Sequence, residues 1–464
     1  MLPASSRAQE GEKKGEKGFR AGAAASNITP RLGRKIVGNF TQPPATHVHD
    51  ELQVRCLVLD DGATRLAFAI CDSVGIDRSV FDAAKRLVQS ETGIPIDNQL
   101  MAATHTHSGV SWNGKDDGDP EYAGFLSRRI ADGIRRAINN LEPAELAIGR
   151  AEEAGQVFNR RWFLTPETKL LSPFGEIDKV KMNPGVGNQA LLKPAGPTDP
   201  EISFLAFRAL DGRHLALLAN YSLHYVGGVP TGEISADYFA VFANLMEEKL
   251  NAKDKARPFV GIMTNGTSGD VNNINFRQAG PRVKPYEKMN QVATLVADRV
   301  YSALQKASFK SNIKLGAQWK EIILQARQPD AERVQWAKRT LAKPDDAPKD
   351  HPLERFYAQR ALNLHDGPSQ AAIALQAFRI GEVGITAIPF EVFAEIGLEL
   401  KKQSPIQPCF NISLANGSGG YLPTPSQHEL GGYETWMGTN KVEKEASVKI
   451  TNTLLDLLNR LNSK

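Results

Sequence analysis

The sequence has few cysteines, and their spacing suits neither a disulfide scaffold nor a metal site. Cys56, Cys71 and Cys409 are the only three among 464 residues, and no CxxC pair occurs. An odd and widely spaced set excludes a disulfide scaffold and a thiolate metal site. Because Cys56 and Cys71 lie inside apolar runs, we expect them to pack as small hydrophobic residues.

The sequence also lacks a strong charge excess and a long hydrophobic run. Its 56 basic and 52 acidic residues leave a net charge of +4, which does not favour nucleic acid as a partner. No run reaches the roughly 20 apolar residues that a membrane span needs. Residues 1–18 contain no apolar signal-peptide core, so we expect no secretory signal in the chain as given. Their charged, Gly-rich composition predicts disorder.

What is present is the composition of a folded protein, with 41% apolar and 23% charged residues. Strand-like runs alternate with helical periodicity, which predicts an α/β fold of layered mixed sheets flanked by helices. We expect residues 19–464 to form a single large catalytic domain. The predicted strands are 51–75 (two strands and a turn), 98–104, 201–210, 214–223, 259–264 and 371–389. The predicted helices are 77–91, 121–140, 238–250, 286–305, 391–402 and 442–461.

Two segments interrupt this alternation. Residues 183–200 are rich in Gly and Pro, and a loop of that length inside a domain favours a functional role. Residues 328–368 are strongly charged, and we expect a solvated helical pair with a structural role, broken between Pro344 and Pro352.

The strongest local motif is Thr-His-Thr-His-Ser-Gly at 104–109, which follows the apolar run 100–103. If the strand continues through it, His105 and His107 face the same side, because strand residues i and i+2 do so. Neutral imidazole is a common zinc ligand. The alternative is a pair of polar histidines at a strand end, although strand ends are where α/β folds build their sites.

Four further polar clusters each follow an apolar strand. His224 ends one strand, and the Gly-rich turn 264–270 follows another, where its N–H groups could form an anion-binding nest or oxyanion hole. Glu391 stands at a strand-to-helix junction, where it could instead stabilise the helix dipole. Residues 416–423 form a loop that presents Tyr421. Each has a structural alternative, but two histidines, one carboxylate and an open position are the composition of a catalytic zinc site.

Taken together, these motifs resemble the neutral/alkaline (non-lysosomal) ceramidase family. The resemblance is carried by an ordered series that covers roughly residues 19–461: TPRLG, THTHSG, ANYSLH, ISADYF, a Gly–Asp turn, PFE and GGYLPTP. It implies a zinc amidohydrolase that cleaves the N-acyl bond of ceramide.

The resemblance also implies roles for individual residues. Four positions match the family's zinc site: His105, His224, Glu391 and Tyr421. His107 matches the histidine beside the metal-bound water, and Arg160, preceded by Asn159, would face a developing oxyanion. Within the Gly–Asp turn, Gly266 and Asp270 are the candidate catalytic positions.

The chain departs from the family pattern in two places. Gly266 occupies the position of a serine that has a catalytic role in the family, and neither Thr267 nor Ser268 is in register to replace it. This favours attack by zinc-bound water, with His107 handling the proton. The second departure is length, since the immunoglobulin-like C-terminal domain of longer members is not expected.

Three hypotheses about function follow. The first is hydrolysis of ceramide or a related N-acyl lipid, with contact at a membrane surface and, by resemblance, a secreted or periplasmic location. The second keeps zinc but changes the substrate to a small polar ester, lactone or amide. The third is a metal- or carbohydrate-binding protein without catalysis. An apolar rim would favour the first, and the candidate rim aromatics are Trp112, Trp162, Phe163 and Trp436.

Overall fold

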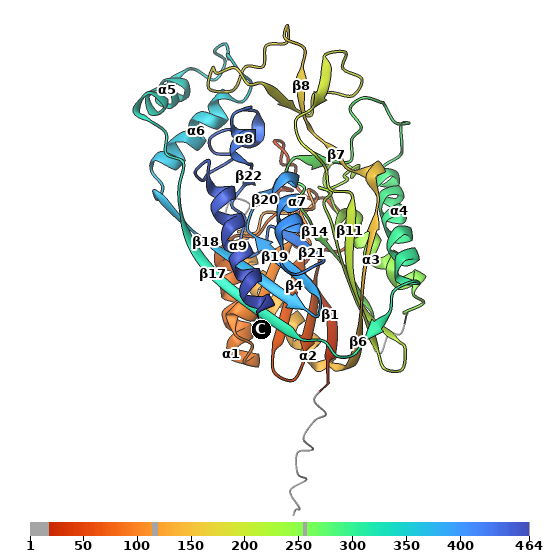
Figure 1. Cartoon of the computed structure of the whole chain (residues 1–464). Coiled ribbons are helices and arrows are strands. Elements are labelled where there is room, and N and C mark those ends of the chain that lie inside the picture. The colour runs from red at the N-terminus through yellow and green to blue at the C-terminus, as the bar shows by residue number, and fades with distance from the viewer. Residues whose placement is uncertain (1–17, 114–118, 254–257, 464) are drawn as a thin grey trace, which may run out of the picture.

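The structure is a computed structural model that describes residues 18–113, 119–253 and 258–463. Two sheets dominate it (Figure 1). The larger has the order β14-β12-β11-β6-β1-β3-β4-β5, with β16 (Phe309–Lys310) also paired to β6, and the smaller has the order β17-β18-β19-β21. The strands of the larger sheet are β14 (Val260–Asn265), β12 (His214–Tyr221), β11 (Glu201–Ala209), β6 (Glu142–Glu152), β1 (Arg20–Asn27), β3 (Gln53–Asp60), β4 (Arg65–Cys71) and β5 (Gln99–Ala103). Those of the smaller sheet are β17 (Leu315–Gln325), β18 (Gln370–Ile380), β19 (Val383–Ile388) and β21 (Cys409–Ser413).

The larger sheet divides into two wings at the contact between β1 and β6. Only Arg20 and Ala21 of β1 pair with β6 there. Inward residues of both wings and of the smaller sheet belong to one central core, which contains Phe68, Phe207 and Phe378. The three strand surfaces therefore enclose a shared interior.

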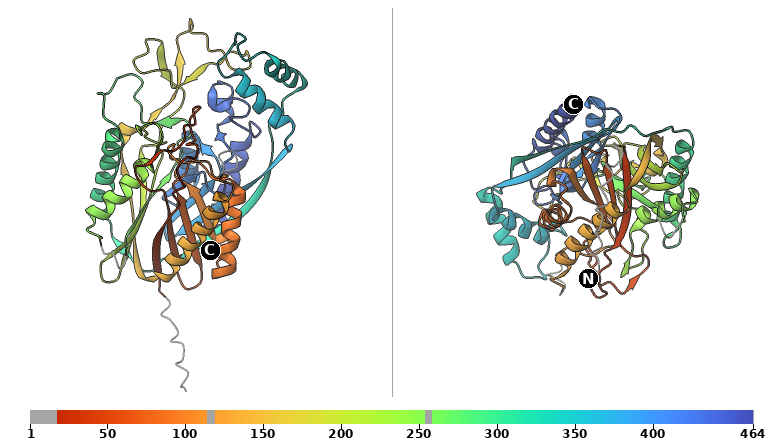
Figure 2. Two further views of the ribbon diagram at one scale, coloured as in Figure 1. Left: turned by 180° about the vertical axis from the view of Figure 1, so that it is seen from behind. Right: turned by 90° about the horizontal axis from the view of Figure 1, so that it is seen from below.

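Helices cover the outer face of each strand surface (Figure 2). The wing built on β1, β3 and β4 carries α1 (Arg78–Thr92) and α2 (Tyr122–Asn139). The wing built on β11, β12 and β14 carries α3 (Asp237–Lys249) and α4 (Glu287–Leu304). The smaller sheet carries α7 (Ala394–Gln403) and α9 (Ala446–Asn462). This arrangement confirms the layered α/β fold that the sequence predicts.

Burial on both faces explains why the strands read as continuous apolar runs. In β4, Leu66, Phe68 and Ile70 face the central core, while Ala67 and Ala69 face the helices. Side chains alternate between the two faces of a strand, so both sets must be apolar. Cys56 and Cys71 are buried free thiols on the helix side, which confirms their prediction as core residues.

Most predicted elements are present, with their ends shifted by one to a few residues. The helix predicted at 77–91 is α1, and the Asp77 side chain accepts from the N–H of Ser79 as its N-cap. The prediction missed β1, β6 and β17 entirely. None of the helices in the described ranges is both long and apolar enough to span a bilayer. Apart from Gly18, the segment expected to be disordered lies outside those ranges.

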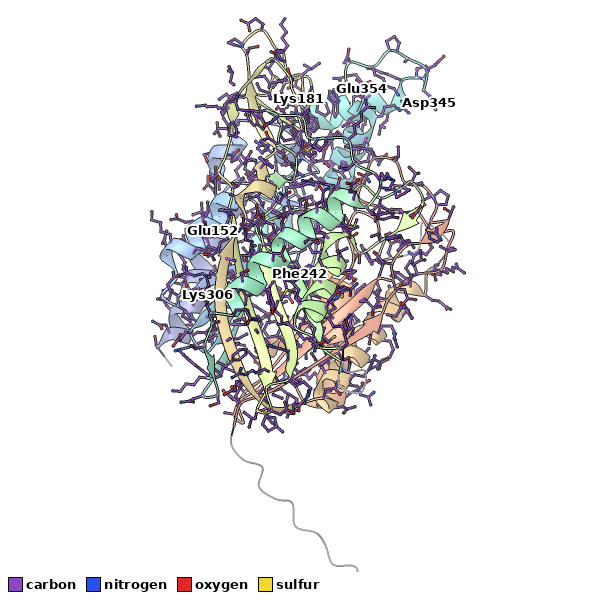
Figure 3. All side chains as sticks on the ribbon, turned by 90° about the vertical axis from the view of Figure 1, so that its right-hand side faces the viewer. Glu152, Lys181, Phe242, Lys306, Asp345 and Glu354 are labelled. Atoms are coloured by element: carbon purple, nitrogen blue, oxygen red, sulfur yellow. The ribbon has the colours of Figure 1, made fainter. Side chains whose placement is uncertain are left out.

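Two extensions stand at one end of the molecule. One is the three-stranded sheet β10-β8-β9, formed by β8 (Arg161–Leu164), β9 (Val180–Met182) and β10 (Leu191–Pro194). The prediction of a continuous loop over 183–200 is therefore wrong, because β10 pairs with β8 inside it. The other is the predicted charged pair, α5 (Ala331–Ala342) and α6 (Glu354–His365). Lys181 and Glu354 mark the two extensions in Figure 3.

One charged side chain lies in the contact between the two sheets and their helices. Lys85 of α1 is 0% exposed, and its Nζ donates to Oδ1 of Asn416 at 2.8 Å. The same ammonium lies 4.6 Å from the ring centroid of Trp319 on β17. Burial lowers the pKa of Lys85 to about 7. An unfolded lysine keeps its proton up to a pKa of about 10.4, so the unfolded chain binds more protons than the folded chain between these values.

We therefore expect Lys85→Met to stabilise the protein relative to wild type most strongly near pH 7. Because the unfolded state binds the extra proton, wild-type stability rises with pH, and this advantage of the variant should shrink by about 2 kcal/mol between pH 7 and pH 9. Urea unfolding at pH 7, 8 and 9 measures it. Lys320→Met, at an exposed position of β17, is the control, and a difference that stays constant with pH would contradict the assignment.

Candidate metal centre

Three imidazoles converge at the end of the molecule where β5, β12 and β14 finish. Nε2 of His105 lies 2.9 Å from Nε2 of His224 and 3.2 Å from Nε2 of His107. The ligand atoms of all three lie within 4.8 Å of one another. The structure thus brings together three histidines that are separated by up to 119 residues in the chain.

His105 and His107 face the same point, but not through the continuous strand that the sequence predicts. β5 ends at Ala103, and His105 has a φ of 81° in the left-handed region. Strand alternation therefore does not apply, and that part of the prediction is wrong. Non-glycine residues avoid this conformation, at a cost of roughly 1–3 kcal/mol. The His105 N–H bonds to the carbonyl of Ser73, and such contacts hold the turn in place.

The tautomers of His105 and His224 follow from their partners. Nδ1 of His105 lies 2.5 Å from the carbonyl oxygen of Val74, and Nδ1 of His224 lies 2.9 Å from that of Ser268. A carbonyl only accepts, so each Nδ1 carries the proton and each Nε2 presents a lone pair. Metal-binding histidines typically donate their other N–H in this way.

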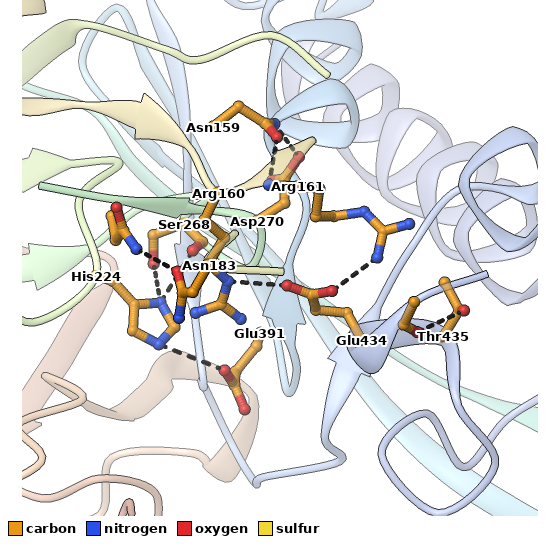
Figure 4. Close-up of polar contacts among 12 residues, drawn as sticks. Asn159, Arg160, Arg161, Asn183, His224, Ser268, Asp270, Glu391, Glu434 and Thr435 are labelled. Atoms are coloured by element: carbon orange, nitrogen blue, oxygen red, sulfur yellow. Dashed lines mark hydrogen bonds and ion pairs between the residues drawn. The ribbon is translucent and has the colours of Figure 1, made fainter. Parts of the chain in front are cut away.

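A carboxylate oxygen completes the cluster. Oε2 of Glu391 lies 3.3 Å from Nε2 of His105. It also lies 3.8 Å from Nε2 of His224, the contact that Figure 4 draws. It is buried and receives no hydrogen bond from the described residues. Two imidazole lone pairs and an unpaired carboxylate oxygen facing one another repel unless a cation lies between them. The donor set therefore fits a divalent metal ion.

The protonation states agree with this donor set. Burial, then the neighbouring His105 and Arg160, lowers the pKa of both His107 and His224 well below the ordinary value. Burial alone would raise the pKa of Glu391, but His105, Tyr421 and Arg160 together hold it below its usual range. His107 and His224 are thus neutral imidazoles and Glu391 is an ionised carboxylate, which are the forms that bind metals.

Glu391 and Tyr421 are positioned by a two-residue strand pair. β20 (Glu391–Val392) runs parallel to β22 (Tyr421–Leu422), with Glu391 opposite Tyr421. The alternative reading of Glu391 as a helix-dipole residue is wrong, because α7 begins at Ala394. The Tyr421 phenol lies beside the Glu391 carboxylate, and its role at a zinc ion stays a prediction.

His107 is enclosed differently from the other two histidines. Its ring stacks on Tyr225, with centroids 3.8 Å apart and planes 15° from parallel. The backbone of Gly38 covers it on another side, and a Cβ at Gly38 would lie 2.7 Å from Cγ of His107. Its Nδ1 makes no hydrogen bond of good geometry within the described residues. Sequence patterns give no sign of either contact.

Arg160 lies on the side of the site that is formed by Tyr421. Its guanidinium carbon is 5.3 Å from the centroid of the Tyr421 ring. The backbone N–H of Arg160 donates to the carbonyl of Asp270, because β7 (Phe158–Asn159) pairs with β15 (Val271–Asn272). The carboxylate of Asp270 accepts from the N–H of Ala394 and from Asn159. Burial raises its pKa to about 6. These contacts tie Asp270 to the segments that carry Arg160 and Glu391, and its predicted catalytic role stays a prediction.

The turn at 264–270 does not form the predicted nest. The N–H of Gly266 donates to the carbonyl of Tyr221, that of Thr267 to Oγ of Ser222, and that of Gly269 to the carbonyl of Val392. These donors are engaged within the fold, so they cannot bind an anion. A Cβ at Gly266 would lie 2.6 Å from Oγ of Ser222, and the glycine contributes no chemical group to the site. The catalytic role of Gly266 stays a prediction, without support from these contacts.

The aromatic side of the site agrees with the predicted rim at Trp436, whose ring centroid lies 5.8 Å from that of Tyr433, and differs from it at Trp162 and Trp112. Trp162 is buried in a small cluster of its own, and Trp112 packs on the cluster beneath α1 and α2. Instead, rings lead from Tyr421 outward to Tyr433, at 5.8 Å, and from Tyr433 to Phe40, at 6.1 Å. Phe40 is 56% exposed.

Solved structures of ceramidases match this chain over nearly its whole length. A neutral ceramidase from Pseudomonas aeruginosa superposes with a TM-score of 0.71 at 16% identity, over 97% of this chain and 75% of that one. The chain shares the neutral ceramidase fold. A ceramidase complexed with C2 gives a TM-score of 0.69 at 16% identity, over 97% and 76% of the two chains. No family model matches the sequence. At the level of fold, the resemblance seen in the motifs is confirmed.

We expect the purified protein to contain one divalent metal ion per chain, and His224→Ala to lose it. The substitution removes one of two lone pairs that face the same point, so metal affinity should fall by at least about 10-fold. Elemental analysis after gel filtration measures the stoichiometry. His214→Ala, at the other end of β12, should keep the metal, whereas equal metal content in both variants would contradict the site.

Proposed function

We propose that this chain is a zinc-dependent amidohydrolase that cleaves the N-acyl amide bond of ceramide or a related N-acyl lipid. The observation that carries the proposal is the convergence of the His105 and His224 lone pairs on the unpaired Oε2 of Glu391. Two histidines and a carboxylate are the protein ligands of many catalytic zinc sites. The two structures with the same fold are both described as ceramidases, which supports this choice of reaction.

Zinc bound to these residues would supply a water whose pKa is near 7 and would polarise the amide carbonyl. The residues around it divide the remaining work. His107 is neutral, and its Nε2 lies 3.2 Å from that of His105, within reach of the same water. It can accept the proton of the attacking water and pass it to the leaving nitrogen. Its Nδ1, unlike those of His105 and His224, is not bonded to a carbonyl, which fits a proton-handling role better than a ligand role.

Arg160 supplies the charge that the reaction needs on the carbonyl side. Its Nη2 is buried and has no hydrogen-bond partner within the described residues. A donor in that state can bond to the carbonyl oxygen as negative charge develops on it. Losing one such donor typically costs about 10²–10³-fold in kcat.

Chelation should abolish hydrolysis of an N-acyl sphingoid amide, and added Zn²⁺ should restore it. The removal of the ion leaves no group in the described site to ionise a water at neutral pH. Turnover assayed before and after dialysis against a chelator measures this. Full activity in metal-free protein would contradict the proposal, and metal binding without turnover of any amide or ester would favour a non-catalytic protein.

The exposed aromatic rings favour a substrate with an apolar portion. Phe40 contacts Phe356 of α6 at 5.9 Å as well as Tyr433, and Phe356 is 43% exposed. Exposed apolar side chains that are contiguous with a site mark ligand-binding surfaces more often than isolated ones do. The second candidate, hydrolysis of a small polar ester, lactone or amide by the same zinc, is favoured by the glycine at position 266.

Phe40→Ala discriminates between these substrates. For a long-chain N-acyl amide we expect KM to rise by about 10-fold, because one exposed aromatic contact contributes roughly 1–2 kcal/mol, with little change for an N-acetyl amide. Phe125→Ala, an exposed phenylalanine on α2, is the control. Equal effects on both chain lengths, or turnover of polar esters alone, would favour the second candidate.

A further inference from the structure

Glu434 is a buried carboxylate that none of the predicted roles uses. It is 0% exposed and lies in the short 3₁₀ turn η4 (Tyr433–Thr435). Its Oε1 accepts from Nε of Arg160 at 2.9 Å, and its Oε2 accepts from Nη1 of Arg161 at 2.7 Å (Figure 4). One carboxylate therefore binds two consecutive guanidinium groups.

The two arginines use their donors differently. Arg161 bonds through Nε to Gln427, through Nη1 to Glu434 and through Nη2 to the carbonyl of Gly431, and it is 0% exposed. Its guanidinium is therefore held entirely within the protein. Arg160 donates to Glu434 through Nε alone, and its guanidinium also contacts the Tyr421 phenol. Its Nη2 remains buried without a partner of good geometry in the described part of the chain. Of the pair, Arg160 alone has a buried donor free to meet a substrate.

The two guanidinium groups have different further anionic neighbours. Asp178 and Asp270 lie near Arg161, whereas Arg160 lies near Glu391 of the metal centre. The charge of Arg160 contributes to the lowered pKa values of His107, His224 and Glu391. Arg160 therefore acts on the metal centre while its Nε stays attached to Glu434.

We propose that Glu434 is a positioning residue that holds Arg160 so that Nη2 meets the reacting carbonyl oxygen. The backbone of Arg160 is already bonded to Asp270, but its side chain is long and lies beside the anionic Glu391. Without Glu434, the guanidinium would turn towards the Glu391 carboxylate, because a buried cation and anion attract strongly. The bond from Nε to Glu434 prevents this reorientation. The inference rests on the proposed amide hydrolysis.

The experiment is steady-state kinetics of Glu434→Gln on an N-acyl amide. We expect kcat to fall by about 10- to 100-fold, the cost of misplacing one group by roughly 1 Å, while KM changes by less than about 3-fold because the site binds ground-state substrate as before. Metal content and melting temperature are measured alongside. Glu354→Gln is the matched control, since Glu354 is also buried, at 3% exposed, and paired to Lys343.

A double-mutant cycle then separates positioning from general stability. In an Arg160→Ala background, Glu434→Gln should cost no further kcat, because the residue on which it acts is gone. A multiplicative loss in the double variant, or an unchanged kcat in Glu434→Gln alone, would overturn the inference. If Glu434→Gln does not fold, Glu434→Asp provides the same cycle with the charge retained. Failure of the wild-type protein to hydrolyse any amide would instead refute the proposed function, so the two failures are distinguishable.

Discussion

The site depends on two imidazole nitrogens that meet with their lone pairs facing each other. The carbonyls of Val74 and Ser268 each accept from Nδ1, so in the neutral imidazoles Nε2 of His105 and His224 presents a lone pair. At a separation of 2.9 Å in a buried setting, with the Glu391 oxygen beside them, these atoms require a positive centre. The features around them either position these atoms or act on what a cation there would hold.

The fold brings these atoms together because strands from both wings of the larger sheet and from the smaller sheet end at the same place. β5 delivers His105, β12 delivers His224, and β19 leads to Glu391 on β20. The wings of the larger sheet and the smaller sheet share one core, so the relative positions of the three ends are set by close packing. Asp270 links the segment that carries Arg160 to the segment that carries Glu391. Its carboxylate accepts from Asn159, which precedes Arg160, and from the N–H of Ala394, which follows Glu391 in the chain.

The sequence predicts those parts of the structure that leave a local pattern. Runs such as β4 are visible because both their faces are buried. β1 gives no clear strand pattern, because its central run Ala21–Ala25 consists of Ala and Gly, which favour strands weakly. Close packing explains why β1 needs such small residues, since a Cβ at Gly22 would lie 2.3 Å from the carbonyl oxygen of Ala137 on α2. Such a close approach of helix and strand cannot be seen in one segment alone.

The candidate site shows the same division. The metal-ligand candidates could be named because each follows an apolar run, and the order of motifs resembles a known family. Their conformations could not be predicted, because no sequence pattern indicates the left-handed backbone of His105 or the two-residue strand at Glu391. Glu434 was missed because its partner Arg160 is 274 residues away. The predicted nest at 264–270 failed because its N–H groups bond within the fold, which only coordinates reveal.

The central claim is that a cation lies between the imidazoles of His105 and His224 and the carboxylate of Glu391. Anomalous diffraction from crystals of the purified protein, collected on both sides of the zinc absorption edge, tests it most directly. The account predicts one strong difference peak within bonding distance of Nε2 of His105, Nε2 of His224 and Oε2 of Glu391. A clean map at that position, in crystals of protein that hydrolyses an N-acyl amide, would contradict it.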